Sequence, residues 1–411
     1  MRKLKAYLLS LATVILAACN GFERPYEGTY DQVLIYFGLG YNNLAANLRD
    51  NLDTLRSDVL PGLSSDKAIL AVCHLTGRSG DYSTTNPPCL MRIYRGPGGK
   101  PVTDTLQIYD GVSLSASPDF LRQALSDAAS RFPAHHYGML FSSHGTGWIP
   151  AGYSSGSESS SIRQRSALHS DGTSPWPATK AVGNQFVGSS NNMRWIEMKD
   201  FAEAIPFHLD YMILDNCLSG CVELAWELRD VCDRLVVSPT EILTSGMVYK
   251  TLSWDMFAGA VPDLETYCRE YFEFYDAQSG ANRSGTITLV DCTQLEPLAD
   301  AFGAIVSTHR EALAKALHAG VQRYYYESSP FRFYYDLRDL SEVLGASSSE
   351  MSALDAALAA AVPYHAETPT FFDLSLERCC GLSVYIPDPL RTRLNAHYRS
   401  LSWNGRVHLV E

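Results

Sequence analysis

Short apolar runs alternate with segments of helical periodicity along most of this chain. Residues 68–72 form a continuous apolar run, the pattern of a strand that is buried on both faces. Leucines recur at helical spacing through residues 44–55, directly after an apolar strand at residues 33–37. This alternation predicts a parallel sheet covered by helices. Further strands are expected at residues 91–94 and 106–109 (an edge hairpin), 235–238 and 286–290, and further helices at residues 117–128, 195–205, 222–230, 295–317 and 352–362.

Two other apolar runs each end on a reactive side chain with glycine close by. Residues 139–141 lead to His144, and residues 212–214 lead through Asp215 to Cys217. The 73 positions between them (217 − 144) leave room for a helix, so the two runs fit neighbouring parallel strands. Active sites of open α/β sheets collect at the carboxyl ends of such strands. We therefore expect a thiolate–imidazole dyad of Cys217 and His144.

Peptide hydrolysis by a cysteine needs a thiolate, a proton carrier and donors to the tetrahedral oxyanion. A free thiol has a pKa of about 8.5, so an imidazolium or a helix N-terminus must lower it. The helix predicted from residue 222 follows Cys217 closely enough to contribute. His144 would protonate the leaving amine and then activate water. The backbone amides of Gly145 and Cys217 would form the oxyanion hole, with each donor contributing on the order of 3 kcal/mol.

Several short motifs, in order along the chain, resemble one enzyme family. Residues 143–148, Ser-His-Gly-Thr-Gly-Trp, look like the His-Gly-x-Gly-Trp segment of the clostripain family of cysteine peptidases, which belong with caspases, legumains and gingipains. Residues 215–218, Asp-Asn-Cys-Leu, are similar to that family's Asp-x-Cys-Leu/Met segment around the nucleophile. The resemblance covers roughly residues 31 to 390, because similar segments also occur at residues 33–36, 42–44, 335–337 and 381–387.

The resemblance implies a caspase-like α/β fold, with a mostly parallel central sheet flanked by helices and a C-terminal α/β extension. It also implies an endopeptidase that cleaves after Arg or, less often, Lys and needs no cofactor for the chemistry. Calcium dependence occurs in the family, although no calcium-binding loop is recognisable here. The chain departs from the family pattern at Tyr41, where the turn usually has Asp, and at Ser143, where an acidic residue often precedes the histidine.

Asp215 is the candidate for substrate recognition. It lies two positions before Cys217 on an extended strand, so both side chains point to the same side. Its carboxylate would sit under the pocket for the residue on the acyl side of the cleaved bond, and the resemblance implies that the matching Asp recognises Arg or Lys there. A turn- or helix-capping role is the alternative, since Asp in an Asp-Asn pair often caps.

Residues 152–190 show no periodic pattern and include a serine-rich run at residues 154–161. A stretch of this length inside a compact domain is often functional or disordered. Members of the family are commonly activated by self-cleavage after a basic residue in the corresponding segment. The resemblance therefore makes Arg163, Arg165 and Lys180 candidate processing sites, with a surface loop carrying incidental basic residues as the alternative.

The first residues have the form of a secretory signal. Three positive charges in residues 1–5 precede an apolar run at residues 6–18 that is shorter than a typical membrane span. Residues 16–19, Leu-Ala-Ala-Cys, look like a bacterial lipobox. This implies cleavage before Cys19, lipidation of its thiol and an extracytoplasmic, membrane-anchored protein on the periplasmic face or cell surface. An ordinary signal peptide that contains a cysteine is the alternative.

The charge and the cysteine content limit which classes of partner and metal site are expected. The net charge of −12 disfavours nucleic acid and anionic membrane surfaces and suits basic peptides. Nine cysteines remain beside Cys19 (10 − 1) and form no Cys-x-x-Cys zinc pair, so no metal site is expected. An odd number leaves at least one unpaired thiol, for which Cys217 is the candidate. Cys221 either faces Cys217 on a helical turn or is a small core residue.

The expected organisation is a signal peptide (1–18), a tether (19–30), a catalytic core (31–260) and a C-terminal subdomain that continues the same domain (261–411). The expected function is a lipid-anchored cysteine endopeptidase. A surface lipoprotein that uses the fold as a peptide-binding module without turnover is one alternative. A transpeptidase or amidase with the same dyad is another.

Overall fold

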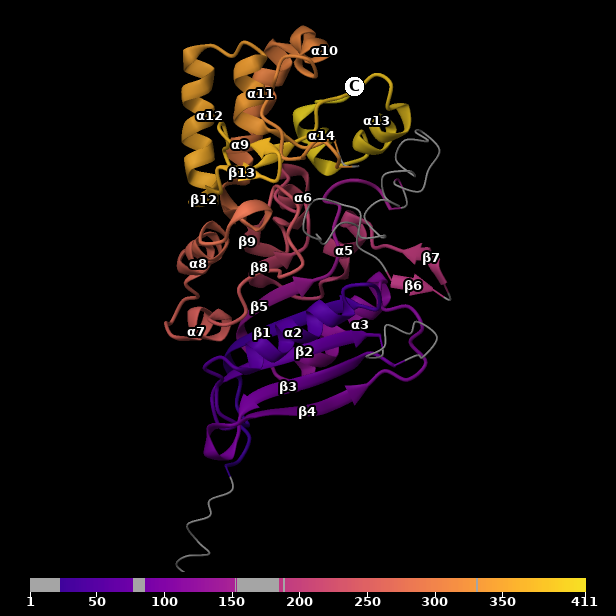
Figure 1. Ribbon diagram of the computed structural model, residues 1–411, viewed down its shortest axis with the longest axis vertical. Coiled ribbons are helices and arrows are strands. Elements are labelled where there is room, and N and C mark those ends of the chain that lie inside the picture. Colours follow the sequence, from indigo (N-terminus) through magenta and orange to yellow (C-terminus); the bar gives the residue numbers. More distant parts are fainter. Residues whose placement is uncertain (1–22, 77–85, 152, 154–184, 188, 330–331) are drawn as a thin grey trace, which may run out of the picture.

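A nine-stranded sheet runs through the part of the chain that the computed structural model describes, namely residues 23–76, 86–151, 153, 185–187, 189–329 and 332–411 (Figure 1). The apolar runs at residues 33–37 and 68–72 lie in neighbouring parallel strands; both are buried on both faces, as predicted for residues 68–72. The strands lie in the order β12 (Tyr364–Glu367), β10 (Thr286–Asp291), β9 (Cys232–Val237), β8 (Leu209–Asp215), β5 (Ala134–Ser142), β1 (Tyr30–Gly40), β2 (Lys67–Leu75), β3 (Cys89–Arg95) and β4 (Pro101–Ile108).

The middle of the sheet is parallel. Strands β9, β8, β5, β1 and β2 all run in one direction, so their carboxyl ends share one side of the sheet, called here the carboxyl edge. The predicted hairpin of β3 and β4 forms the antiparallel margin at one end of the sheet. At the other end, β10 is antiparallel to both β9 and β12. This arrangement confirms the expected mostly parallel, caspase-like sheet.

The two faces of the sheet carry different aromatic side chains. Phe37 on β1 and Phe141 on β5 point to one face, the phenylalanine face, where Phe120 of α3 (Pro118–Arg131) packs against Phe37. Tyr36 points to the opposite, tyrosine face and packs against Tyr249. Helix α3 begins as its sequence predicts, because its N-cap serine accepts a hydrogen bond from the Phe120 amide and is followed by proline.

Two helix predictions need correction. The helix expected over residues 295–317 ends at Thr308 as α9 (Leu295–Thr308), because the backbone of His309 is not helical. The His309 ring bonds Glu350, which belongs to the capping box of a neighbouring helix. A separate short helix, α10 (Leu313–Ala316), follows. The helix expected from residue 195 starts only at Met198, because Glu197 is extended and its carboxylate accepts the Ala151 amide.

The remaining elements surround the sheet, with the C-terminal helices gathered beyond β12 (Figure 1). The helices are α2 (Ala45–Arg56), α5 (Met198–Ala204), α6 (Val222–Leu228), α7 (Leu252–Phe257), α8 (Leu264–Asp276), α9 (Leu295–Thr308), α10 (Leu313–Ala316), α11 (Leu337–Val343), α12 (Ser348–Ala361), α13 (Thr392–Tyr398) and α14 (Ser402–Val407). Small antiparallel pairs join β6 (Gln185–Val187) to β7 (Ser189–Arg194), β11 (Tyr335–Asp336) to β15 (Ser383–Val384), and β13 (Thr370–Phe371) to β14 (Leu374–Ser375).

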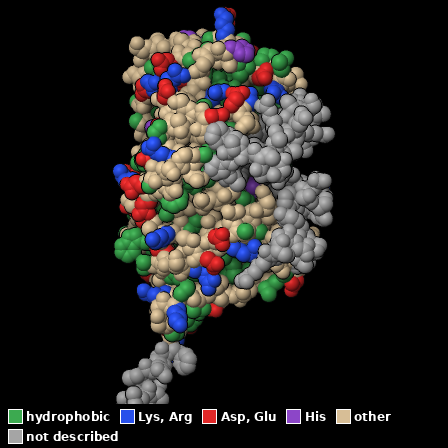
Figure 2. Space-filling model, viewed as in Figure 1, with side chains coloured by type: hydrophobic (Ala, Val, Ile, Leu, Met, Phe, Trp, Pro, Cys, Tyr) green, Lys and Arg blue, Asp and Glu red, His purple; other side chains and the backbone are tan. Residues whose placement is uncertain are grey.

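Within the described ranges, no helix is long and apolar enough to cross a membrane. No two cysteines of these ranges form a disulfide. On the surface shown in Figure 2, basic and acidic side chains are interspersed and do not gather into one large patch of a single sign.

Candidate active site

The two predicted catalytic residues follow adjacent strands at the carboxyl edge. Strands β5 and β8 pair in parallel, with Ser142 beside Asp215, as their apolar patterns predict. His144 and Cys217 each come two residues after this pair, so they occupy matching positions beyond the ends of the two strands. The sheet register therefore brings an imidazole and a thiol to the same part of the edge.

Cys217 is fully buried and contacts the loop that follows β9. Its Sγ accepts a hydrogen bond from the Ile242 amide at 3.1 Å, while the thiol faces the Ile242 carbonyl oxygen at 3.7 Å. A backbone N–H aimed at sulfur favours the thiolate over the thiol, because it stabilises the negative charge. Sequence reasoning gave this role to the helix after Cys217 and missed Ile242, which lies 25 residues further on.

His144 is held by a side chain from the turn that follows the neighbouring strand β1. Its Nε2 lies 2.7 Å from Oδ1 of Asn43, in the turn after β1. The turn is fixed by Asn42, whose Oδ1 accepts the Leu44 amide at 2.8 Å. Because an amide oxygen only accepts, Nε2 carries the proton in this pair and Nδ1 is the basic nitrogen of the neutral ring. The sequence resembles the family at residues 42–44, but it does not predict that Asn43 contacts His144.

Glycines after His144 allow two loops to touch. A Cβ on Gly145 would lie 2.8 Å from Cγ of Asn216 and 2.9 Å from the carbonyl oxygen of Cys217. Gly147 has a φ of 55°, and a Cβ there would lie 2.5 Å from the carbonyl oxygen of Leu218. Any larger residue would therefore push the His144 loop away from the Cys217 loop.

Leu218, directly after Cys217, has a left-handed backbone with a φ of 59°. Its amide donates to the Thr240 carbonyl oxygen at 2.9 Å, and the Gly220 amide donates to the Ser238 carbonyl oxygen at 2.8 Å. These bonds attach the Cys217 loop to the loop after β9. The unusual backbone of Leu218 is thus maintained by its surroundings.

Asp215 is fully buried on the tyrosine face. Ser142 donates to its Oδ2 at 2.7 Å, the Tyr249 hydroxyl donates to the same oxygen, and the Met247 amide donates to Oδ1 at 3.1 Å. These donors come from distant parts of the chain, and not from the turn that follows Asp215. Burial, and secondly the charge of Asp215, raises the pKa of Tyr249 well above its usual value, so its hydroxyl stays protonated and donates.

More tyrosines surround this carboxylate. Burial raises the pKa of Tyr36, Tyr267, Tyr271 and Tyr275 above the usual value, and the nearby charge of Asp215 contributes to each shift. Among the described residues, the hydroxyls of Tyr267 and Tyr271 have no hydrogen-bond partner, and that of Tyr36 faces Ser142. Buried polar oxygens normally have a hydrogen-bond partner, so unpaired hydroxyls beside Asp215 indicate a place where a polar group of a ligand can bind.

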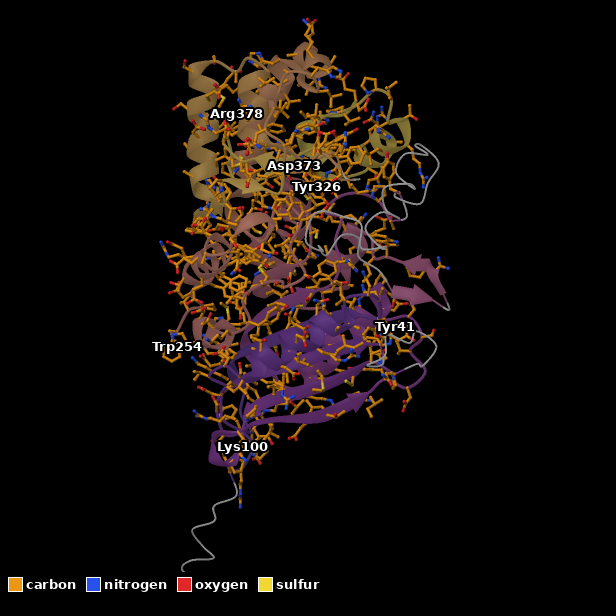
Figure 3. The ribbon with its side chains drawn as sticks, in the orientation of Figure 1. Tyr41, Lys100, Trp254, Tyr326, Asp373 and Arg378 are labelled. Atoms are coloured by element: carbon orange, nitrogen blue, oxygen red, sulfur yellow. The ribbon has the colours of Figure 1, made fainter. Side chains whose placement is uncertain are left out.

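A second buried carboxylate lies next to the nucleophile. Glu241 directly precedes Ile242 and accepts hydrogen bonds from the hydroxyls of Tyr326 and Ser329, each at 3.3 Å. In Figure 3, Tyr326 lies in the upper half of the view, close to Asp373. The charge of Cys217, as well as that of Glu241, contributes to the raised pKa of Tyr326, although burial is the largest cause.

Cys221 lies in the core behind the site. Burial raises the pKa of its thiol well above the usual value, which leaves it a poor nucleophile. It caps α6, whose Glu223 is fully buried and accepts the Tyr385 amide and the Tyr398 hydroxyl on one oxygen. Burial raises the pKa of Glu223 to about 7.

Other predicted residues lie outside the described ranges. They are the lipidation site Cys19 and the candidate processing sites Arg163, Arg165 and Lys180. Within the described ranges, no cluster of three or more His, Cys, Asp or Glu side chains is arranged to hold a metal ion.

Residues 167–368 match the sequence profile described as the Clostripain family. No curated protein sequence matches the chain. Two solved structures share its fold over most of its length. An inactive zymogen C11 protease from Parabacteroides distasonis is 23% identical and covers 93% of this chain and 99% of its own, with a TM-score of 0.73. A secreted C11 cysteine protease from Bacteroides thetaiotaomicron is 21% identical and covers 93% of this chain and 100% of its own, with a TM-score of 0.70.

A second structure of a secreted C11 cysteine protease from Bacteroides thetaiotaomicron, with an irreversible peptide inhibitor, has a TM-score of 0.72 at 21% identity over 92% of this chain and 99% of its own. At these identities the structures establish the fold, while the profile match carries the family. The chain is a member of the clostripain family of cysteine endopeptidases.

Proposed function

We propose that this endopeptidase is lipid-anchored and cleaves after Arg or Lys with Cys217 as nucleophile and His144 as general acid and base. The observation that carries the proposal is the sheet register, because both residues come two positions after the paired Ser142 and Asp215. The contact between Gly145 and the Cys217 carbonyl oxygen supports it further, since the two loops touch at this point.

Acylation would begin with transfer of the Cys217 proton to Nδ1 of His144. Asn43 positions the ring for this step, and the Ile242 amide stabilises the thiolate. Sulfur then attacks the carbonyl carbon, and the backbone amides of Gly145 and Cys217 bind the resulting oxyanion. When the carbon–nitrogen bond breaks, the imidazolium gives its proton to the leaving amine.

Deacylation would use the same groups. His144 takes a proton from water, and the hydroxide attacks the thioester carbonyl carbon. The oxyanion again forms between the two amides, and its collapse breaks the carbon–sulfur bond. The proton on His144 returns to Cys217 and restores the starting state.

The preference for a basic residue rests on the tyrosine face. Asp215 and Glu241 are buried carboxylates: Asp215 comes two residues before Cys217, and Glu241 directly precedes Ile242, whose amide donates to the sulfur. A substrate guanidinium has five N–H donors, which suit a carboxylate together with the hydroxyl oxygens of Tyr36, Tyr267 and Tyr271. An ammonium has only three donors, so we expect Arg to be preferred over Lys.

Anchoring would fix the orientation of the molecule. Glu23 is the first described residue, and its carboxylate accepts the amide and hydroxyl of Ser64. Cys19 precedes it by four residues (23 − 19), a span of at most ~14 Å of chain. A lipid on Cys19 would therefore hold the Glu23 end of the molecule close to an extracytoplasmic membrane surface. The secreted relative fits an extracytoplasmic location.

Self-cleavage after Arg163, Arg165 or Lys180 would activate the enzyme. Such a step is consistent with the relative that is described as an inactive zymogen. If a fully active preparation contained only intact chain, self-cleavage would not be needed.

The decisive experiment compares the hydrolysis of matched fluorogenic peptides that end in Arg, Lys, Asp or Leu. We expect activity on Arg and Lys peptides, and a loss of at least about 10³-fold in Cys217→Ala, because the nucleophile is gone. Cys221→Ala is the matched control, since its buried thiol has no part in the chemistry and the variant should retain activity.

Cleavage that persists in Cys217→Ala would contradict the assignment of the nucleophile. Cleavage that depends on Cys217 but favours Asp or Leu would keep the dyad and overturn the role of Asp215. If neither the intact wild type nor the wild type after limited proteolysis cleaved any of the peptides, the proposed activity would be wrong.

A further inference from the structure

An apolar cavity of about 100 Å³ borders His144 on the phenylalanine face of the sheet. This volume greatly exceeds the roughly 10–15 Å³ that one water needs on the same measure, so the cavity has room for a side chain. The apolar groups that line it come from β1, β5, α5, α6 and the segment before α5. They include Leu39, Phe141, Ile196, Met198, Phe201 and Leu224, while Ser143, Thr146, Arg194 and Asn216 are polar members of the lining.

The cavity and the carboxylates lie on opposite faces. Leu214 and Asn216 line the cavity, whereas Asp215, between them, is bonded to Ser142 and Tyr249 on the tyrosine face. His144 and Gly145 also line the cavity, but neither Asp215 nor Cys217 does. The reacting groups therefore lie where the two faces meet, with an anionic region on one side and an apolar region on the other.

The chemistry decides which part of a substrate reaches the cavity. The carbonyl carbon must approach Cys217, and the nitrogen of the cleaved bond must approach His144 to receive a proton. Substrate atoms beyond that nitrogen then lie on the His144 side of the sulfur, away from Asp215. We propose that this cavity is the subsite for the residue that follows the cleaved bond, and that it selects an uncharged aliphatic side chain such as that of Leu.

This inference rests on the proposed function and extends it to the leaving side of the substrate. An aliphatic side chain gains free energy when it leaves water for the apolar lining. A polar side chain of the same shape loses its hydrogen bonds to water there, and the apolar groups that make up most of the lining do not replace them. We therefore expect kcat/KM to be about 10- to 100-fold higher for Leu than for the nearly isosteric Asn at this position.

The test uses internally quenched peptides that share Arg before the cleaved bond and carry Leu or Asn after it. Ala151 lines the cavity and is half-buried, so Ala151→Leu fills part of the space from within. Its Leu-to-Asn ratio of kcat/KM should fall about tenfold relative to the wild type. The ratio is read within one preparation, so a smaller active fraction cancels. The matched control is Ala301→Leu, because Ala301 is also half-buried but lies on α9, away from the cavity. This variant should keep the Leu-to-Asn ratio of the wild type.

A ratio near one in the wild type, or a ratio that Ala151→Leu leaves unchanged, would overturn the proposed subsite. A peptide methyl ester that ends in Arg separates this failure from a failure of the proposed function, because methanol is too small to fill the cavity. If the enzyme does not hydrolyse the ester, the Arg preference is wrong. The Leu and Asn peptides are then compared with whichever acyl residue the fluorogenic panel selects.

Discussion

The two faces of the sheet meet at the carboxyl edge, and they carry different aromatic side chains there. On the phenylalanine face, Phe37, Phe120, Phe141 and Phe201 pack against one another and an apolar cavity remains beside them. On the tyrosine face, rings of similar size carry hydroxyls, and they surround the buried charge of Asp215.

This difference of a single oxygen atom per ring separates two kinds of recognition. Phenyl rings exclude water without offering hydrogen bonds, so the space beside them favours aliphatic groups. Phenols fill similar volumes but donate to, or accept from, charged groups, so they make a buried carboxylate tolerable and leave acceptors for a cation. In the proposed function, the sheet thus divides a peptide at the cleaved bond into a basic acyl side and an apolar leaving side.

The largest effect that we expect concerns Glu223, a buried carboxylate on α6, the helix that borders the apolar cavity. Its pKa is about 7 in the folded protein, against 4.5 for an ordinary glutamate, because it is buried. The folded state therefore binds an extra proton between these values, and stability falls as pH rises from about 4.5 to 7. The full difference is about 3 kcal/mol.

Glu223→Gln should remove this part of the pH dependence, which urea unfolding at pH 5 and pH 8 would measure. Glu227→Gln on the same helix is the control, since that side chain is only half-buried. An identical pH dependence in the wild type and Glu223→Gln would contradict the assignment.

The next largest effect tests the charge on the tyrosine face. Asp215→Asn keeps the shape of the side chain but removes its charge, so kcat/KM for an Arg peptide should fall about 10- to 100-fold. A peptide with citrulline, the neutral isostere of Arg, should lose far less. Kinetics on this pair measures the change in the Arg-to-citrulline ratio. Equal losses on both peptides would mean that Asp215 only supports the structure.

The smallest effect exchanges the two aromatic types. Tyr249→Phe removes a hydrogen-bond donor to Asp215. Phe120→Tyr adds a hydroxyl to a ring that packs against Phe37 and Tyr109 in the core. Each change should lower the free energy of unfolding by about 1–2 kcal/mol in urea titrations. Only Tyr249→Phe should also reduce the Arg-to-citrulline ratio. A similar reduction in Phe120→Tyr would show that the faces are not independent.

Local patterns predicted the parts of the fold that depend on neighbouring residues. The apolar runs before His144 and Cys217 predicted adjacent parallel strands, and the serine–proline pair predicted the start of α3. The contacts to the dyad could not be predicted in this way. Asn43 reaches His144 across 101 positions, and Ile242 reaches Cys217 across 25. Loops after different strands meet only because the sheet register aligns the strand ends.

Alternation of side chains along β8 predicts that Leu214 and Asp215 point to opposite faces of the sheet, but no sequence pattern predicted the cavity. Its lining comes from several elements, and α5 begins three residues later than its apolar pattern indicated. Where a space remains between helices and a sheet depends on side-chain volumes summed over all of these elements, which no single segment of sequence encodes.

The left-handed backbone of Leu218 restricts which residues evolution can place directly after Cys217, the proposed nucleophile. A side chain branched at Cβ collides with its own backbone in this region of φ, whereas Leu branches one carbon further out. Single-base changes convert Leu codons to Val or Ile codons, and in most cores these are among the mildest replacements. Here the same changes would strain the loop that carries the sulfur of Cys217. The mutations that are easiest to reach are therefore among those that lineages of this enzyme are least able to keep.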